Sequence, residues 1–246
     1  MCVSLLAFTA SMSSARSVPA TPVFKIARVD YEAPSTDIAQ RVMHEAFNRL
    51  GIPHVFVRFP PLRAINAAND GDADADVVRI ADVAKGFPNL LAVPTPICQV
   101  DVAVYGRDRS VLDLTRAELG KRSFATTRGT FVLTKYSEGL HASQMPSNQA
   151  SFEALTNGRV DAAMMIYIDA ELEIRKQKVE GVERWPYFWA SEPQYFLINK
   201  KHVELVPKID AVLRQMQKEG LIRGSYLEGF KQLDIEPLKS PNLAPR

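Results

Sequence analysis

The residues best suited to chemistry in this sequence are a cation and a set of backbone donors that could hold an anion. Arg79 stands at the carboxyl end of the predicted strand 76–78, where α/β folds bind ligands. Its guanidinium has the planar donor fork that suits a carboxylate or phosphate. Arg128, Gly129 and Thr130 form a turn between a predicted strand and a predicted helix, and free backbone N–H groups at such a turn bind anions. Facing each other across a cleft, the two groups would hold one carboxylate.

Both features also have a plainer interpretation. Arg79 can be a surface residue that pairs with Asp82 or another neighbour, and strand-to-helix turns that contain Gly are common. The pattern Asp72-x-Asp74-x-Asp76 suggests calcium, but it lacks the Gly and the Glu that a calcium loop requires at its sixth and twelfth positions. We therefore expect a solvated acidic turn and no metal site.

The spacing of reactive residues gives no positive argument for catalysis. The four histidines have no metal-ligand spacing and form no nucleophile pattern with Cys98. No phosphate-cradling loop, dinucleotide fingerprint or Gly-x-Ser-x-Gly is present, so we predict no cofactor. Most aromatic residues are core residues, but Tyr31, in the loop after the first predicted strand, and Tyr167 are candidates for ligand contacts. Glu32 is the nearest candidate for an acid or base.

Length and charge limit the class of protein. The 246 residues, with a formal net charge of +2, suffice for one large domain or two lobes of about a hundred residues each. The scattered basic residues do not indicate a nucleic acid or an acidic membrane as partner, and no apolar run approaches the roughly 20 residues of a membrane span. Residues 1–16 look like the later part of a secretory signal peptide without its leading positive charge; the alternative is a disordered tail. Cys98, the one thiol outside this segment, is expected to be buried.

Strands and helices alternate along the first hundred residues. This βαβαβ pattern is typical of a mostly parallel sheet, and it repeats after a polar break at residues 106–110. Ser35 or Thr36 is expected to cap the first helix, and Asn69-Asp70-Gly71 to end the second. The main predicted segments are strands at 23–29, 54–59, 76–78, 98–105, 123–127, 160–168, 182–189 and 194–199, and helices at 37–50, 62–68 and 204–219.

The chain resembles the bacterial extracellular solute-binding proteins of the small, polar amino-acid-binding type. The resemblance covers roughly residues 23 to 230 and lies in the order and spacing of short motifs. These are Val29-Asp30-Tyr31, Gly71-x-x-Asp74 followed by Arg79, Pro88-Asn89-Leu90, Val93-Pro94-x-Pro96, Arg128-Gly129-Thr130, Phe152-x-x-Leu155-x-x-Gly158-Arg159-Val160-Asp161-Ala162, Ile198-Asn199-Lys200-Lys201-His202 and Val212-Leu213-x-x-Met216.

The resemblance implies an α/β fold of two lobes arranged as a clamshell, each with a mostly parallel sheet flanked by helices. Lobe one would hold residues 23–103 and 193–236 and lobe two residues 104–192, with two hinge crossings. The Pro-rich end of the chain, residues 237–246, is expected to be frayed whatever the family. The aromatic after the first strand, Tyr31, would pack on the ligand. Arg79 and the Gly129-Thr130 turn would take its carboxylate.

One departure from the family pattern affects the expected ligand. Amino-acid binders place an Asp for the ligand's ammonium about five residues after the Asp-Ala of lobe two, where this chain has Ile166, followed by Tyr167. A buried ammonium without a counter-charge is costly, so a carboxylate or a neutral polar or aromatic solute is as plausible as an α-amino acid.

The expected function is therefore capture of a small polar or carboxylate-bearing ligand by a periplasmic, monomeric protein that serves a membrane transporter or a sensor. Two alternatives stay open. A sensory or partner protein could have kept the fold and lost the ligand, with its cleft filled by its own side chains and Arg79 tied up internally. A periplasmic dehydratase-like enzyme would need an acid or base in the cleft, for which Glu32 is the candidate.

Overall fold

A single sheet of ten strands runs through the computed structural model, which describes residues 23–237. Its strand order is β2-β1-β3-β10-β5-β8-β6-β7, with β4 beside β10 and β9 beside β5. The strands are β1 (Phe24–Val29), β2 (His54–Phe59), β3 (Ala75–Ile80), β4 (Leu90–Ala92), β5 (Cys98–Gly106), β6 (Ser123–Thr127), β7 (His141–Met145), β8 (Ala162–Ile166), β9 (Glu183–Arg184) and β10 (Ala190–Asn199).

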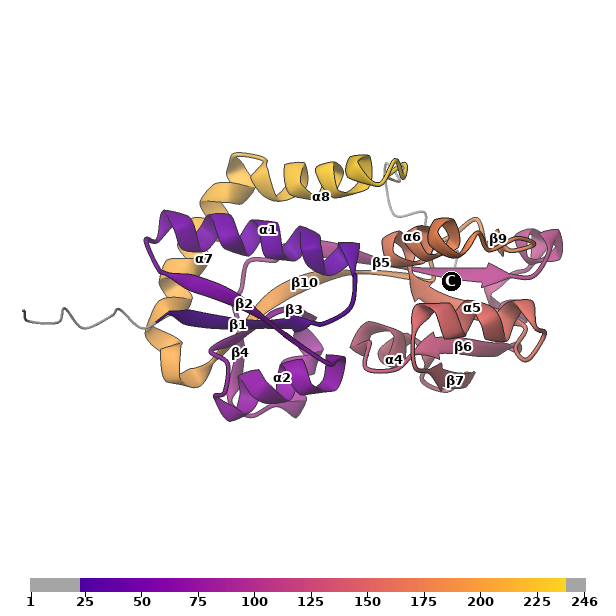
Figure 1. Ribbon diagram of the computed structural model, residues 1–246, viewed down its shortest axis with the longest axis horizontal. Helices are drawn as coiled ribbons and strands as arrows, with labels where there is room; N and C mark the ends of the chain where they lie inside the picture. Colours follow the sequence, from indigo (N-terminus) through magenta and orange to yellow (C-terminus); the bar gives the residue numbers. More distant parts are fainter. Residues whose placement is uncertain (1–22, 238–246) are drawn as a thin grey trace, which may run out of the picture.

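Helices cover this sheet at both of its ends, which gives the molecule two lobes (Figure 1). We call the part built on β1 to β4 lobe one and the part built on β6 to β9 lobe two. The helices are α1 (Pro34–Arg49), α2 (Pro61–Asp70), α3 (Arg116–Leu119), α4 (Phe131–Ser137), α5 (Asn148–Thr156), α6 (Tyr167–Gln177), α7 (Val206–Lys218) and α8 (Leu221–Gln232), with 3-10 helices η1 (Ala81–Gly86), η2 (Arg109–Asp113) and η3 (Lys200–Leu205).

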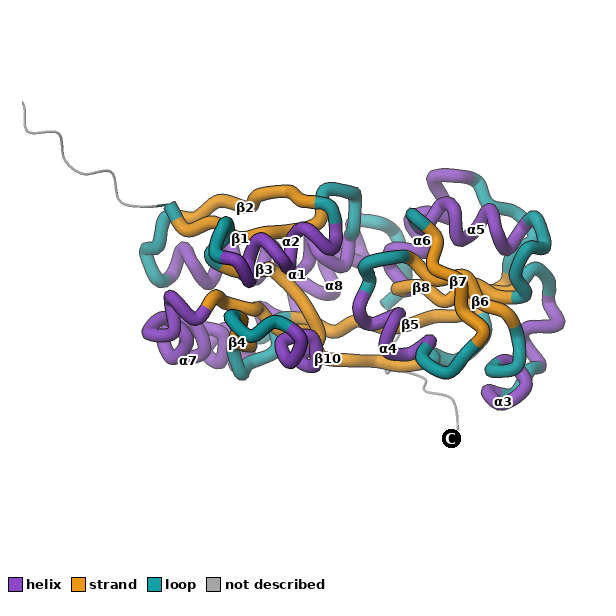
Figure 2. The backbone as a smooth tube through the Cα atoms, turned by 90° about the horizontal axis from the view of Figure 1, so that it is seen from below, coloured by secondary structure: helices purple, strands orange, loops and turns teal. Residues whose placement is uncertain are grey.

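Two long strands connect the lobes, as the predicted fold requires. β5 and β10 pair antiparallel from Cys98 with Gln194 to Val102 with Ala190. Beyond this shared stretch, β10 continues along β3 and β4, whereas β5 continues along β8 and β9. Figure 2 shows both strands passing between the lobes. The predicted two-lobed α/β class with two crossings is confirmed, and the residue boundaries of the lobes stay a prediction.

The local sequence explains where the first two helices of lobe one begin, pack and end. Ile38, Val42 and Ala46 are buried along one side of α1, as an apolar stripe at helical spacing requires. α2 ends at Gly71, whose φ of 90° is left-handed, so the predicted stop is confirmed. The predicted cap of α1 is wrong: the N-cap is Ala33, without a side-chain bond, because the helix starts at Pro34 and both Ser35 and Thr36 lie in its first turn.

Two other elements differ from their predicted extent. The strand expected at 160–168 ends at Ile166, and Tyr167 begins α6. The strand expected at 182–189 is reduced to β9, Glu183–Arg184, and it is followed by Pro186, which has no backbone N–H for a ladder. Trp185 and Trp189 still donate N–H bonds to Val104 and Val102 of β5, so the segment stays beside that strand.

Aromatic side chains fill the core in both lobes. In lobe one Phe47 packs against Phe24 and Phe196, with ring centroids 4.9 and 5.8 Å away. In lobe two Trp189 packs against Phe124 at 5.9 Å. Cys98 is buried and free, as predicted. The predicted signal segment 1–16 and the tail beyond residue 237 lie outside the described residues, and between residues 23 and 237 no helix is long and apolar enough to cross a membrane.

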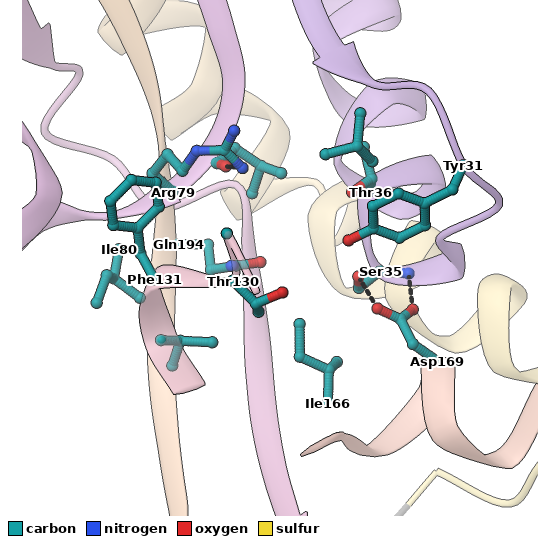
Figure 3. Close-up of a pocket in the computed structure, with 14 residues that line it drawn as sticks. Tyr31, Ser35, Thr36, Arg79, Ile80, Thr130, Phe131, Ile166, Asp169 and Gln194 are labelled. Carbon is teal, nitrogen blue, oxygen red and sulfur yellow. Dashed lines mark hydrogen bonds between the residues drawn. The ribbon is translucent and has the colours of Figure 1, made fainter. Parts of the chain in front are cut away.

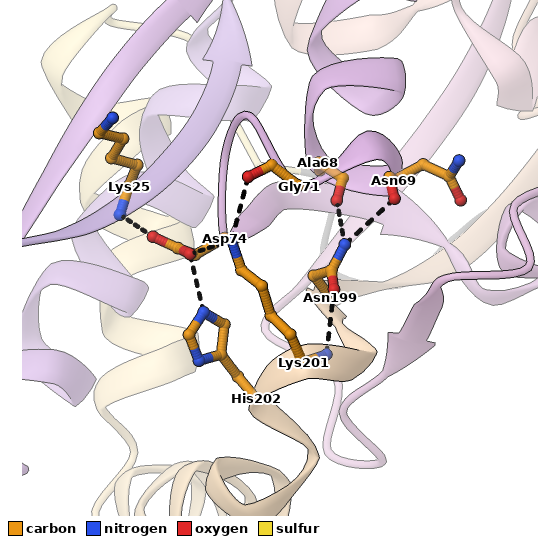
Figure 4. Close-up of polar contacts among 8 residues, drawn as sticks. All are labelled: Lys25, Ala68, Asn69, Gly71, Asp74, Asn199, Lys201 and His202. Atoms are coloured by element: carbon orange, nitrogen blue, oxygen red, sulfur yellow. Dashed lines mark hydrogen bonds and ion pairs between the residues drawn. The ribbon is translucent and has the colours of Figure 1, made fainter.

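The acidic turn after α2 is solvated only in part: Asp72 is exposed, as expected from the sequence, whereas Asp74 is largely enclosed and Asp76 is buried. Asp74 accepts a hydrogen bond from the Lys25 backbone N–H at 2.8 Å and pairs with Lys201 and His202 at 2.7 Å each (Figure 4). Asn199 donates to the carbonyls of Ala68 and Asn69 beside it. The carboxylate of Asp74 therefore joins β1, the start of β3 and η3.

We predict that Asp74→Asn lowers the free energy of unfolding by about 1–3 kcal/mol, because three donors lose a charged acceptor. The matched control is Asp72→Asn, two residues earlier. Asp72 pairs with Arg63 at 3.3 Å where both side chains are exposed, so its loss should change stability by less than about 0.5 kcal/mol. Urea unfolding at neutral pH measures both.

The stabilisation that Asp74 provides should depend on pH in a definite direction. Burial alone would raise the pKa of Asp74, but hydrogen bonds from Lys201, the Lys25 backbone and His202 outweigh burial and lower it. A carboxyl group with a lowered pKa stabilises the fold above its unfolded pKa of about 3.9 and loses this contribution as the pH falls through the folded value. The difference between wild type and Asp74→Asn should shrink below about pH 4; an unchanged difference at pH 3 would contradict the assignment.

Candidate functional site

A pocket lies where the two lobes meet, and residues from both lobes line it (Figure 3). Lobe one supplies Tyr31, the first turn of α1 and the end of β3; lobe two supplies the start of α4 and the junction of β8 with α6; the crossing strand β10 supplies Gln194. The lining residues are Val29, Tyr31, Ser35, Thr36, Val78, Arg79, Ile80, Gly129, Thr130, Phe131, Val132, Ile166, Asp169 and Gln194.

Arg79 reaches this pocket because of an irregularity in β3. In the pairing with β10, Arg79 lies opposite Tyr195 and Asp76 opposite Leu197, so three steps along β3 match two steps along β10. The extra residue is a bulge, which changes the side on which the next side chain emerges. Without it, residues three apart on a strand would point to opposite faces. The bulge therefore places Asp76 and Arg79 on one side, where their carboxylate and guanidinium lie 2.8 Å apart.

Arg79 pairs with a neighbour, Asp76, but this pair is largely buried and not at the surface. Asp76 is fully buried, and burial raises its pKa although Arg79 and the Val78 N–H oppose the shift. Asp82, the expected surface partner of Arg79, instead pairs with Lys85 and Lys135. Nη1 of Arg79 donates to the Val78 carbonyl at 3.1 Å. Nη2 is the atom that forms the ion pair with Asp76, and among the described residues the buried Nε makes no aligned hydrogen bond.

Tyr31 faces Arg79 from the other side of the pocket (Figure 3). Burial raises the pKa of its hydroxyl, Asp169 adds to this rise and Arg79 opposes it. The hydroxyl is therefore a neutral hydrogen-bonding group at physiological pH. A ring with a polar tip can both pack on a ligand and bind its polar groups, as the resemblance implies.

The predicted turn of lobe two comes close to lobe one. Gly129 has a φ of 77°, and a Cβ built on it would lie 2.8 Å from Cβ of Pro61, the first residue of α2. The Thr130 N–H donates to the Thr127 carbonyl at 3.3 Å, and the Arg128 N–H to Met145 at 2.9 Å. Both N–H groups thus have acceptors within the protein. The turn therefore has fewer free backbone donors for an anion than the sequence predicted.

A carboxylate from lobe two binds the start of the first helix of lobe one. Asp169, in the first turn of α6, accepts hydrogen bonds from the Ser35 N–H at 2.9 Å and the Ser35 hydroxyl at 2.8 Å (Figure 3). Both side chains are buried. Asp169 thus supplies the cap that α1 lacks in its own sequence, and it does so from the opposite lobe.

Three predicted site residues lie outside this pocket. Glu32 is exposed and pairs with Lys176 of α6. The Arg128 side chain is exposed. Tyr167 is buried because it starts α6, and its ring packs against Phe188 and Phe230 at 5.4 and 6.0 Å. Tyr31, Arg79, Gly129 and Thr130 are the predicted residues that the fold brings together.

Four residues that line the pocket were not predicted as site residues, namely Ser35, Thr36, Asp169 and Gln194. Ser35 and Thr36 were interpreted only as helix caps. Asp169 follows a strand predicted two residues too long, so its place in a first helical turn could not be seen. Gln194 is the first residue of the strand predicted to return to lobe one. Its position at a crossing between the lobes could have identified it as a site residue.

The lobes touch around the pocket. Lys135 of α4 pairs with Asp82 of η1 at 2.9 Å and with Glu192 of β10 at 2.6 Å, and the ring of Phe131 lies 6.0 Å from that of Phe87. The space left between them for small molecules is about 40 Å³. The structure is therefore a closed form.

Solved structures show the fold of the chain, whereas no protein-family model and no curated protein sequence matches it. The ligand-binding core of GluR0 in complex with L-glutamate is similar with a TM-score of 0.73 and 15% identity, over 85% of this chain and 98% of that one. A histidine kinase sensor domain with similarity to periplasmic binding proteins has a TM-score of 0.68 and 14% identity, over 91% and 98%. The substrate-binding protein of an amino acid ABC transporter has a TM-score of 0.66 and 14% identity, over 86% and 100%. The chain thus has the two-lobed fold of the type II periplasmic binding proteins.

We predict that Gly129→Ala pushes the lobes apart, because its new methyl group would meet Pro61 of lobe one. The matched control is Gly139→Ala, which has the same φ of 77° and no atom within 4 Å of the new Cβ. Both should lose about 1–2 kcal/mol to the left-handed backbone. Only Gly129→Ala should increase the radius of gyration in small-angle X-ray scattering; equal radii for the two variants would contradict this contact.

Proposed function

We propose that the chain is a periplasmic solute-binding protein that captures a small polar or carboxylate-bearing ligand between its lobes and delivers it to a membrane transporter. The observation that carries this proposal is Arg79, a cation at a bulged strand end that lines the interlobe pocket. Tyr31 and Thr130 line the same pocket from opposite lobes. A ligand that contacts both lobes stabilises the closed form by the contacts that it gains there.

The fold is compatible with the proposed function but does not determine it. One similar structure is the binding protein of an amino acid transporter and another is a sensor domain, so transport and sensing are both compatible with this architecture. We place the protein in the periplasm, because residues 1–16 look like part of a signal peptide.

A second candidate function is a sensory or partner protein that keeps the fold without a ligand. Two observations favour it: Arg79 is paired internally with buried Asp76, and the closed pocket leaves a space of about 40 Å³. A ligand would then have to compete with Asp76 for the guanidinium or bind a more open form. The dehydratase alternative loses its candidate acid or base, since Glu32 lies outside the pocket and pairs with Lys176.

A thermal-shift screen with amino acids, small dicarboxylates, aromatic acids and polyamines tests the proposal. A ligand at 100 times its dissociation constant should add about 2.7 kcal/mol, which raises the melting temperature by roughly 5–10 °C for a chain of this size. Arg79→Ala should abolish the shift. The matched control is Arg128→Ala, which removes an exposed guanidinium outside the pocket and should keep it.

The outcomes separate the candidates. A shift that survives in Arg79→Ala would keep ligand binding but contradict the site. The absence of any shift across the panel would contradict the solute-binding proposal for these ligand classes and favour the ligand-free sensory or partner protein.

A further inference from the structure

The contact between Asp169 and Ser35 is a carboxylate enclosed between two lobes. Asp169 belongs to α6 of lobe two and Ser35 to α1 of lobe one, and the two hydrogen bonds between them measure 2.9 and 2.8 Å. Asp169 is 5% exposed and Ser35 is 8% exposed. Since the two residues come from opposite lobes, any opening that separates α6 from α1 returns this carboxylate to water.

No cation among the described residues forms an ion pair with Asp169. The cations that α6 itself carries near its other end have other partners: Lys176 pairs with Glu32, and Arg175 donates to the carbonyls of Leu233 and Asp234. The charge of Asp169 is thus met by the Ser35 donors and by the positive end of the α1 dipole.

The ionisable groups that face Asp169 from neighbouring elements add little positive charge. On α1, Asp37 opposes ionisation of Asp169, and it is itself paired with Arg28 at 2.8 Å. Tyr31, in the loop before α1, is neutral, and Arg79 beyond it is paired with Asp76. Further along α6, Glu171 accepts a hydrogen bond from the Tyr105 hydroxyl of β5 at 2.9 Å. Asp101 of β5, which lines a small pocket together with Ser35, accepts a hydrogen bond from the Tyr226 hydroxyl at 3.0 Å.

We propose that closure of the lobes takes up a proton at Asp169, so that mild acid favours the closed form. Closure moves a carboxylate without a counter-ion from water into the protein, which disfavours its charged form. A protonated Asp169 still fits the contact: one oxygen can accept the Ser35 N–H, and the Ser35 hydroxyl can rotate to accept the new O–H. Protonation therefore removes the cost of the charge and keeps the contact.

The direction and size of the pH effect on closure follow from the pKa of Asp169 in the two forms. Burial raises the pKa of Asp169 to about 6 in the closed form, against the opposing effect of the Ser35 hydrogen bonds. An exposed Asp in the open form has a pKa of about 3.9. The closed form binds more protons between these values, so the ratio of closed to open molecules rises as the pH falls. Between pH 7.5 and pH 5 the expected increase is about tenfold.

This regulation rests on the proposed function only in that the same cleft would hold the ligand. If a ligand binds the closed form, its apparent affinity should follow the closed fraction and rise in mild acid. The coupling itself exists without any ligand, so it can be tested whether or not a ligand is found.

Small-angle X-ray scattering of the ligand-free full chain between pH 7.5 and pH 5 tests the proposal. The variant is Asp169→Asn, which keeps the shape of the side chain and has no charge to bury. The matched control is Asp161→Asn. Asp161 accepts the same two bonds from one serine, the N–H of Ser123 at 2.9 Å and its hydroxyl at 2.7 Å, but both residues lie within lobe two.

The wild type should become more compact as the pH falls, and Asp161→Asn should follow it. Asp169→Asn should be as compact at pH 7.5 as the wild type is at pH 5, with no pH response. A wild type whose radius of gyration is constant over this range, or an Asp169→Asn variant that responds to pH like the wild type, would overturn the proposal. The wild-type result alone is decisive if the variant does not fold, and circular dichroism at each pH verifies the fold.

Discussion

The antiparallel pairing of β5 with β10 is the constraint on which the rest of the structure depends. Five residue pairs, from Cys98 with Gln194 to Val102 with Ala190, join the only stretch that the two strands share. On one side of this stretch β10 continues along β3 and brings Arg79 to the crossing; on the other β5 continues along β8 and brings Ile166 opposite Val102. The pocket therefore lies where the lobes are joined, and Gln194 stands at the point where β10 changes partner.

The buried charged groups at this crossing have polar partners within the protein. Arg79 has buried Asp76 beside it, and Asp169 has the first turn of α1. Charges buried between lobes are costly unless they are paired and hydrogen-bonded; in the closed form Arg79 has an ion-pair partner, whereas Asp169 has hydrogen bonds alone. A bound ligand must therefore improve on contacts that already exist, and this explains why a solute-binding protein and a ligand-free relative of it are difficult to distinguish by fold.

The sequence predicts local features well and contacts between lobes poorly. Gly71 ends α2 because a left-handed position follows an apolar-periodic run, and the strand that delivers Arg79 begins a few residues later; short-range rules suffice for both. The bulge that turns Arg79 toward Asp76 depends on the pairing of β3 with β10, more than a hundred residues later in the chain. The bond between Ser35 and Asp169 spans 134 positions, and Tyr167 was misplaced because helix and strand periodicity cannot locate the residue at which β8 gives way to α6.

The central proposal is that a small molecule binds between the lobes at Arg79. Native mass spectrometry of the folded protein after incubation with a low-molecular-weight cell extract tests this claim most directly, because it needs no prior choice of ligand. We expect the mass of one small molecule to be added to the wild type and to be absent from Arg79→Ala. An unchanged wild-type mass, or the same added mass in both proteins, would contradict the account.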